Sequence, residues 1–158
     1  MVRTVGEDAA DQKIVDDIAK FGWHCVDIMA EGDAGPFSFT VGLFNTYKHP
    51  ELIIFGLPSN IAHRILQTAV EAVQRIQPLD LSAPTNELIE GYPCCFVQVP
   101  ADQYGDHVGF CRWYYEGNEF PLYQIVWPSR TGHFPWHPEA AASFRATQPV
   151  LGYVSKGN

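Results

Sequence analysis

The chain has 158 residues, of which 46% are hydrophobic and 13% aromatic, as expected for one folded domain with its own core. It carries 18 acidic and 10 basic side chains, a net charge of −8, and the basic residues are scattered. This balance argues against a nucleic-acid partner, which requires clustered Lys and Arg. No run approaches the ~20 apolar residues of a membrane span. Four cysteines without metal or disulfide spacing suit a reducing cytosol. We therefore expect one cytoplasmic domain over 1–158, with its core at about 11–152 and without a membrane partner.

The first part of the chain predicts one helix followed by two strands. Apolar residues three and four apart predict a helix over 11–21, which Gly22 ends. A strand is expected over 23–29. The clearest pattern is at 37–43, where large apolar residues alternate with Ser, Thr and Gly, as in a strand with one buried face. Residues 45–50 are predicted to form a polar connection.

The second part predicts three more strands and two helices. The apolar run 52–57 is typical of a central strand. A helix is expected from 61 to about 76, before Pro78. Strands are predicted at 92–99 and 123–127, and a weaker helix at 104–115 lies between them.

Four spaced motifs resemble one known family. They are Phe39-Thr-Val-Gly-Leu43, His49-Pro-Glu-Leu52 running into Phe55-Gly-Leu-Pro58, Gln124-Ile-Val-Trp-Pro128, and Phe134-Pro-Trp136. Their order and spacing resemble the bacterial domain-of-unknown-function family 4262, over roughly Ile14 to Gly152. The sequence departs from that pattern at Ser129 and His137, where the family often carries acidic residues.

The order of elements is also similar to that of flavin-reductase split barrels. This similarity implies an α+β fold in which an antiparallel sheet curls into a barrel-like form with two to three helices. It also implies that the polar segment 40–46 lies against a flavin ring. The leading hypothesis is therefore a small-molecule binding domain for FMN or a deazaflavin, which as an enzyme would carry out redox chemistry.

Eight residues are candidate contacts to such a ligand. Three are polar residues of the segment that would face the ring system, and a fourth, a histidine, lies in the polar loop that continues it. Two lie where a helix N-terminus could hold a phosphate, and two belong to the last strand, whose Trp would pack on the open side. They are Thr40, Asn45, Thr46, His49, Ser59, His63, Gln124 and Trp127. Ordinary loop formation and helix capping are the alternative interpretation of these residues.

Metal and nucleophile chemistry find less support in the sequence. His133 and His137 are four apart, but Pro135 lies between them in an irregular segment, and that spacing aligns two rings only on a helix. We therefore predict no metal site. No cysteine lies in a context that would lower its pKa.

Two further functions remain as alternatives to ligand binding. One is an immunity-like or antitoxin-like interaction module, whose acidity would steer it to a basic partner. The other is a metal-dependent hydrolase that uses the scattered histidines. The aromatic, Pro-rich tail beyond Pro128 is expected to cover an open barrel edge, and it could also serve as a homodimer interface.

Overall fold

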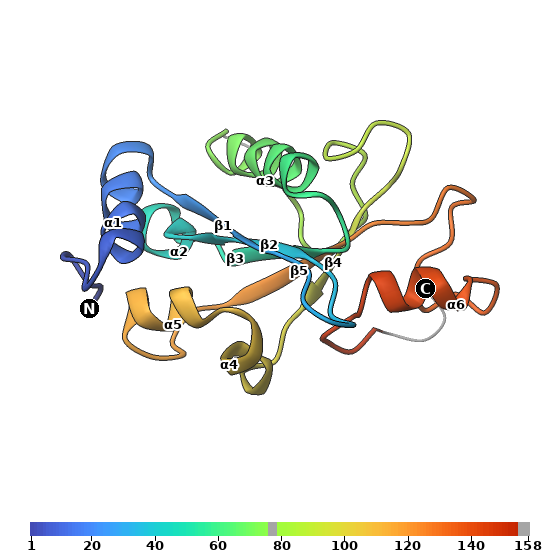
Figure 1. Cartoon of the computed structure of the whole chain (residues 1–158). Coiled ribbons are helices and arrows are strands. Elements are labelled where there is room, and N and C mark those ends of the chain that lie inside the picture. The colour runs from blue at the N-terminus through green and yellow to red at the C-terminus, as the bar shows by residue number, and fades with distance from the viewer. Residues whose placement is uncertain (76–78, 155–158) are drawn as a thin grey trace.

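A computed structural model describes residues 1–75 and 79–154 of the chain (Figure 1). Within these ranges it contains five strands, six α-helices and one short 3-10 helix. The strands are β1 (His24–Ile28), β2 (Phe37–Val41), β3 (Glu51–Phe55), β4 (Cys95–Gln98) and β5 (Leu122–Val126). The helices are α1 (Ala9–Phe21), α2 (Leu43–Tyr47), α3 (Ser59–Val73), η1 (Ala101–Gln103), α4 (Tyr104–His107), α5 (Gly109–Tyr115) and α6 (Ala142–Thr147). None of the described helices combines the length and apolar character needed to cross a membrane.

The strands form one open, mixed sheet in the order β1-β2-β3-β5-β4. All neighbours are antiparallel except the central pair, β3 and β5, which run parallel with Ile53 opposite Gln124. The predicted α+β class is therefore confirmed, but the antiparallel, barrel-like sheet and the two or three helices are wrong. The physical reason lies in the long connection from β3 to β5. It holds α3, β4, α4 and α5, and a connection of that length can return the chain for parallel pairing.

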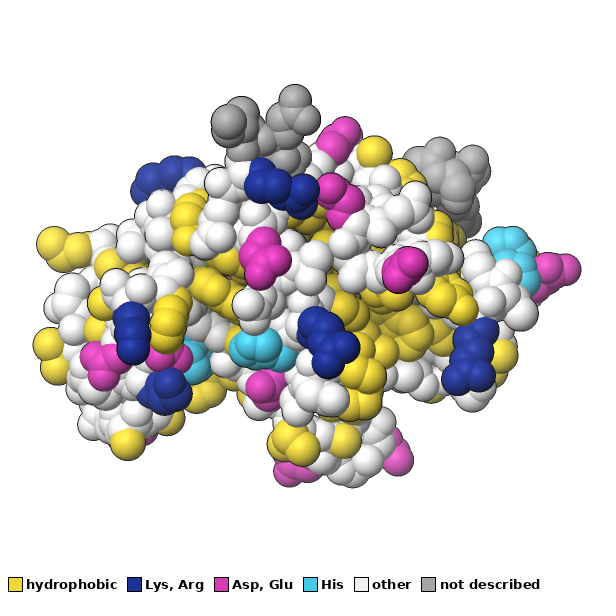
Figure 2. Space-filling model, turned by 90° about the horizontal axis from the view of Figure 1, so that it is seen from above, with side chains coloured by type: hydrophobic (Ala, Val, Ile, Leu, Met, Phe, Trp, Pro, Cys, Tyr) yellow, Lys and Arg dark blue, Asp and Glu magenta, His cyan; other side chains and the backbone are white. Residues whose placement is uncertain are grey.

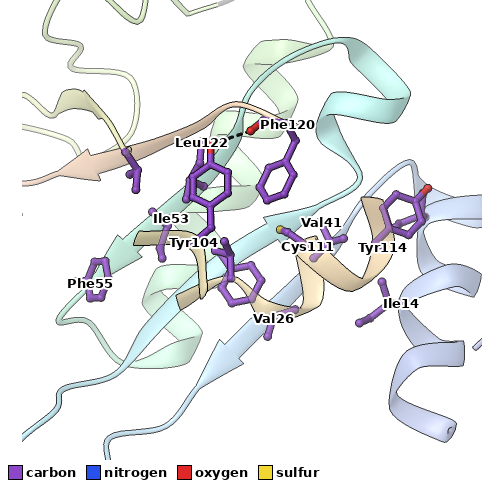
Figure 3. Packing of buried hydrophobic residues seen from close by; sticks show 14 residues of the cluster. Ile14, Val26, Val41, Ile53, Phe55, Tyr104, Cys111, Tyr114, Phe120 and Leu122 are labelled. Carbon is purple, nitrogen blue, oxygen red and sulfur yellow. Dashed lines mark hydrogen bonds between the residues drawn. The ribbon is translucent and has the colours of Figure 1, made fainter. Parts of the chain in front are cut away.

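Helices cover both faces of the sheet, so the core has two halves. In Figure 1, α3 lies above the sheet, while α4 and α5 lie below it. Leu52 and Ile54 of β3 pack with the α3 half, whereas Ile53 and Phe55 pack with the other half. Figure 3 shows that second half, in which Tyr104 and Cys111 of α4 and α5 lie against strand residues and Tyr114 lies at the end nearest Ile14 of α1. Complete burial of an aliphatic side chain contributes roughly 1.5–3 kcal/mol, so both halves stabilise the domain.

Several predicted boundaries are confirmed, and two are wrong. α1 ends at Gly22, whose φ of 90° is the left-handed conformation that glycine adopts readily. β2 stops at Val41, because Gly42 (φ 107°) turns the chain into α2. The segment 45–50, predicted to be a connection, therefore begins inside a helix. The predicted helix over 104–115 is broken at Val108 into α4 and α5.

The long helix after β3 is confirmed as α3, with Ile65, Leu66 and Ala69 among its buried residues. Ile61, near the start of α3, is 42% exposed. The predicted end near Ile76 lies outside the described residues.

Two buried glutamines hold the C-terminal segment onto the sheet. The Gln148 amide donates to the Trp127 carbonyl over 2.8 Å and accepts from the Trp127 N–H over 2.9 Å. The Gln124 amide of β5 donates to Pro149 O over 2.7 Å and accepts from the Leu151 N–H over 3.0 Å. Each glutamine side chain thus pairs with one backbone N–H and one backbone C=O, as a neighbouring strand would. The tail is an integral layer of the domain, consistent with the predicted edge cover, although the sheet it covers is not a barrel.

Candidate functional site

A fully buried carboxylate, Glu51, lies where β2, α2 and β3 meet. Its Oε1 accepts from Thr40 Oγ1 over 2.7 Å and from the Leu43 N–H over 3.2 Å. Its Oε2 accepts from the N–H groups of Gly42 (3.0 Å) and Phe44 (3.2 Å). These N–H groups belong to the first turn of α2, which has no earlier carbonyl to bond them. Glu51 therefore supplies the acceptors that begin α2.

Tyr115 of α5 completes the surroundings of this carboxylate. Its hydroxyl donates to Glu51 Oε2 and accepts from the Asn45 N–H over 3.1 Å. Burial raises the pKa of Glu51, while hydrogen bonds from Tyr115 and Thr40 oppose that shift. Burial beside Glu51 likewise raises the pKa of the Tyr115 hydroxyl. Every acceptor position has a protein donor, so we interpret Glu51 as a structural anion that joins α2 and α5 to the sheet.

Four of the eight predicted ligand contacts lie around this junction. Thr40 is fully buried, and its hydroxyl also accepts the Leu52 N–H over 2.9 Å. Asn45 and Thr46 are exposed on α2, where Thr46 Oγ1 donates to the Gly22 carbonyl over 2.7 Å. His49 is buried, and burial lowers the pKa of its imidazole.

The other four predicted contacts lie in two different places. Ser59 is exposed as the first residue of α3, and the preceding cap residue Pro58 makes no side-chain hydrogen bond. His63, one turn on, is exposed with its ring 5.9 Å from that of Trp23. Gln124 and Trp127 hold the C-terminal segment, and Trp127 Nε1 also donates to the carbonyl of the last residue of β3 over 2.8 Å. The structure thus distributes the eight residues over three regions, and their contact with a ligand stays a prediction.

The cysteines lack the environment of a nucleophile. All four are free thiols. Burial raises the pKa of Cys25 and of Cys94 to about 12, and it raises the pKa of Cys111 well above its usual value. A reactive thiol needs a shift in the opposite direction. These shifts agree with the expectation that no cysteine lies in a context that lowers its pKa.

A concave surface lies against β4, and we call it the β4 hollow. Its volume is about 540 Å³. Its walls are residues 81–84, strand residues 95–97, Phe134, Trp136 and the tail residues 153–154. Figure 2 shows hydrophobic side chains gathered toward this end of the molecule, on the face seen from the α3 side. Concave sites with mostly apolar walls are where small molecules bind in proteins.

Strand geometry supplies the β4 hollow with polar backbone groups. Cys94 exchanges both of its backbone hydrogen bonds with Thr85 on the outer side, at 2.8 and 2.9 Å, while the Val99 N–H donates inward to Leu122 of β5. Because backbone groups alternate in direction along an antiparallel edge strand, the N–H and C=O of Phe96 point outward like those of Cys94. The hollow thus combines aromatic walls with the backbone donor and acceptor of Phe96.

The motif Phe134-Pro-Trp136 provides the aromatic wall. The rings of Phe134 and Trp136 stack with centroids 5.0 Å apart and planes 10° apart. The flanking residues His133 and His137 form a second stack, with centroids 4.2 Å apart. The expectation that this irregular segment would keep the two histidines apart is therefore wrong. A turn in which the His137 N–H donates to the Phe134 carbonyl over 2.9 Å brings them together without a helix.

Ser129 and His137, where the sequence departs from the resembled pattern, lie in one loop. Ser129 Oγ accepts the His133 N–H over 3.2 Å. The sequence identifies Phe134 and Trp136 as part of a motif, but it does not predict that both residues lie against β4. The alternation of His and aromatic residues over 133–137 was the available signal. Which strand edge the segment would face depends on the tertiary fold.

The comparisons with known proteins give a family but no activity. Neither the curated proteins nor the solved structures include a match to this chain. One family model, described as a domain of unknown function, matches residues 17–141, and this span includes β1 to β5, the Glu51 junction and most walls of the β4 hollow. The chain belongs to the DUF4262 family.

Proposed function

We propose that this domain binds a small, flat and mostly apolar molecule in the β4 hollow. The observation that carries the proposal is the joint presence of a volume of about 540 Å³ and a stacked aromatic wall at Phe134 and Trp136. Sites for drug-sized ligands occupy roughly 300–1,000 Å³, with apolar walls and a few polar groups that fix orientation. The outward backbone groups of Phe96 would supply that orientation.

A flavin or deazaflavin is the first ligand class to test. Its ring system is flat, with an apolar end and a polar end that can pair with a backbone N–H and C=O. Aromatic side chains gain by stacking on such a ring, at about 0.5–1.5 kcal/mol beyond the area that they bury. If the ligand is a flavin, the cofactor supplies the redox chemistry and the protein supplies its position.

The tail contributes to the hollow through a glycine. A Cβ added at Gly152 would lie 2.1 Å from Gln98 O, so only glycine lets the tail pass this close to the edge of β4. Tyr153 and Val154, the next two residues, line the hollow. Gly152→Ala is therefore expected to displace this wall while leaving the sheet intact. Gly109→Ala is the matched control, because nothing lies within 4 Å of its added Cβ.

The first experiment is an absorbance spectrum of freshly purified protein, with mass spectrometry of what it releases on denaturation. Tryptophan fluorescence titrations with FMN and with a deazaflavin follow. We expect Trp136→Ala to weaken binding at least about tenfold, the equivalent of ~1.4 kcal/mol. Phe21→Ala, at a 56% exposed site on α1, is the control and should change nothing. Equal binding by wild type and Trp136→Ala would refute the assignment to the hollow. Failure of the wild type to release or bind any such ring compound would refute the ligand class.

A further inference from the structure

We propose that His133, His137 and Glu139 form a binding site for a divalent transition-metal ion of the Zn²⁺ type. One ligand atom from each of the three residues can be chosen so that all lie within 4.8 Å of one another. His133 Nε2 is already 3.5 Å from Glu139 Oε2. Ligand atoms bound at ~2.1 Å in a tetrahedral site lie ~3.4 Å apart. His133 and Glu139 therefore already lie at nearly the separation of two ligands of one ion, whereas His137 has to change its orientation.

The surrounding turns hold these residues in place without a helix. The Ser129 N–H donates to the His133 carbonyl over 2.8 Å, which closes a turn before the first histidine. The His137 carbonyl accepts from the Ala140 N–H over 3.0 Å and from Arg145 Nη2 of α6 over 2.8 Å. The loop backbone is thus fixed to α6 and to its own turns. A metal ion would have to reorganise side chains only.

The Thr131 hydroxyl can fix the tautomer of His133 that binds a metal ion. His133 Nδ1 lies 3.2 Å from Thr131 Oγ1, which in turn lies 3.0 Å from Ser129 Oγ. In the tautomer where Nδ1–H donates to Thr131, the Nε2 lone pair is free and faces Glu139. Metal-binding histidines generally donate their second N–H to an oxygen in this way, which fixes the ring and its tautomer.

His137 has to move for the ion to bind. Its Nδ1 accepts the Glu139 N–H over 3.0 Å, and its ring stacks on His133 with planes only 15° apart. Lone pairs of stacked rings run parallel, whereas two imidazoles on one ion converge. Binding therefore requires His137 to rotate out of the stack, and coordination through its Nδ1 would also break the hydrogen bond from the Glu139 N–H. This makes ring rotation a signature that distinguishes metal binding from a nonspecific surface effect.

The donor set selects the class of ion. Two imidazoles and one carboxylate favour Zn²⁺, Co²⁺ or Fe²⁺ over Ca²⁺ and Mg²⁺, which prefer oxygen ligands. Three protein ligands leave at least one position for water or a ligand, as in catalytic zinc sites and unlike closed structural ones. The position is adjacent in sequence to Phe134 and Trp136 of the β4 hollow. The metal site rests on the histidine and glutamate geometry alone, and it does not depend on the proposed ligand.

The test is calorimetric titration of the untagged, full-length chain with ZnCl₂ at neutral pH, together with the visible spectrum of the Co²⁺ complex. We expect one equivalent of Zn²⁺ at micromolar affinity or tighter. His133→Gln and His137→Gln should each weaken binding at least about tenfold, since loss of even an outer partner costs 10–100-fold. His63→Gln, which removes an exposed imidazole on α3, should bind Zn²⁺ like the wild type.

Several outcomes would overturn the site. Zn²⁺ binding that is detected only at millimolar concentration would overturn it. So would a Zn²⁺ affinity that is unchanged in both His133→Gln and His137→Gln, or one that falls equally in His63→Gln. Co²⁺ provides a second readout, because intense visible bands report four-coordinate ligation and weak bands report the hydrated ion. Trp136→Ala should lose binding of the flavin-type ligand but keep Zn²⁺ binding. Failure of the metal site and failure of the ligand proposal are therefore distinguishable, and circular dichroism checks that each variant is folded.

Discussion

The change Glu51→Gln tests whether the buried carboxylate holds the junction of β2, α2 and β3. Glutamine has nearly the same shape as glutamate, so the change creates no cavity and removes only acceptor capacity. Glu51 is completely buried, and its two oxygens accept three backbone N–H groups and two hydroxyls. No rotation of an amide can satisfy all three N–H groups, because its NH₂ must replace one of the two oxygens.

The loss in the free energy of unfolding depends on which backbone N–H loses its acceptor. If the NH₂ replaces Oε1, the Leu43 N–H faces another N–H; if it replaces Oε2, both Gly42 and Phe44 do. A buried donor without an acceptor costs about 1–3 kcal/mol, and the smaller cost of burying an amide offsets part of this. We expect a net loss of about 2 kcal/mol in the free energy of unfolding. For a chain of this length that lowers Tm by about 4–8 °C.

The assay is urea unfolding at pH 8, followed by circular dichroism, with differential scanning calorimetry for Tm. Glu71→Gln on the exposed face of α3 is the matched control, and it should stay within about 0.5 kcal/mol of wild type. If Glu51→Gln is as stable as that control, the carboxylate does not hold the junction. Glu51 would then have to be reconsidered as a functional group.

Three further predictions concern other buried groups. Burial lowers the pKa of His49 below its usual 6.5, so the unfolded chain takes up a proton first and stability falls as the pH drops below 6.5. His49→Asn keeps a donor for Pro50 O and should abolish that part of the pH dependence in urea titrations. Gln148→Leu leaves both backbone groups of Trp127 without partners and should cost about 2 kcal/mol or more, with faster proteolysis of the tail. The two thiols with a pKa of about 12 should resist DTNB at pH 8 in the native protein and react only after unfolding; rapid native labelling would contradict this.

Short-range sequence patterns predicted those helices and strands whose formation depends on neighbouring residues. The 3.6-residue period and Gly22 located α1, and the alternation after Phe37 located β2. α2 was missed because Asn45 and Thr46 are typical loop formers. That helix exists because Glu51, several residues later, supplies acceptors for its first turn. The signal in the sequence was a single acidic residue at the head of an apolar run.

The sheet could not be predicted correctly, because its central pairing is long-range. Nothing local in the apolar strands indicates that β3 and β5 run parallel with β4 at the edge. The predicted ligand contacts depended on the assumed barrel, and an open sheet separates them. Gln124 and Trp127 lie under the C-terminal segment, while Ser59 and His63 lie on α3. The β4 hollow depends in the same way on where a distant aromatic motif folds.

The position of the hollow follows from what occupies the ends of the parallel strands. In α/β sheets, ligands generally bind beyond the carboxyl ends of parallel strands. Here the chain itself fills that place: Trp127 Nε1 donates to Phe55 O, and a Cβ at Gly56 (φ 85°) would lie 2.6 Å from Thr147 O. No side chain fits at Gly56, so the α6 end packs directly on the backbone after β3. With that place occupied, the β4 hollow lies one strand outward from β5. This argument predicts that truncation before α6 would open a new apolar surface beyond Phe55.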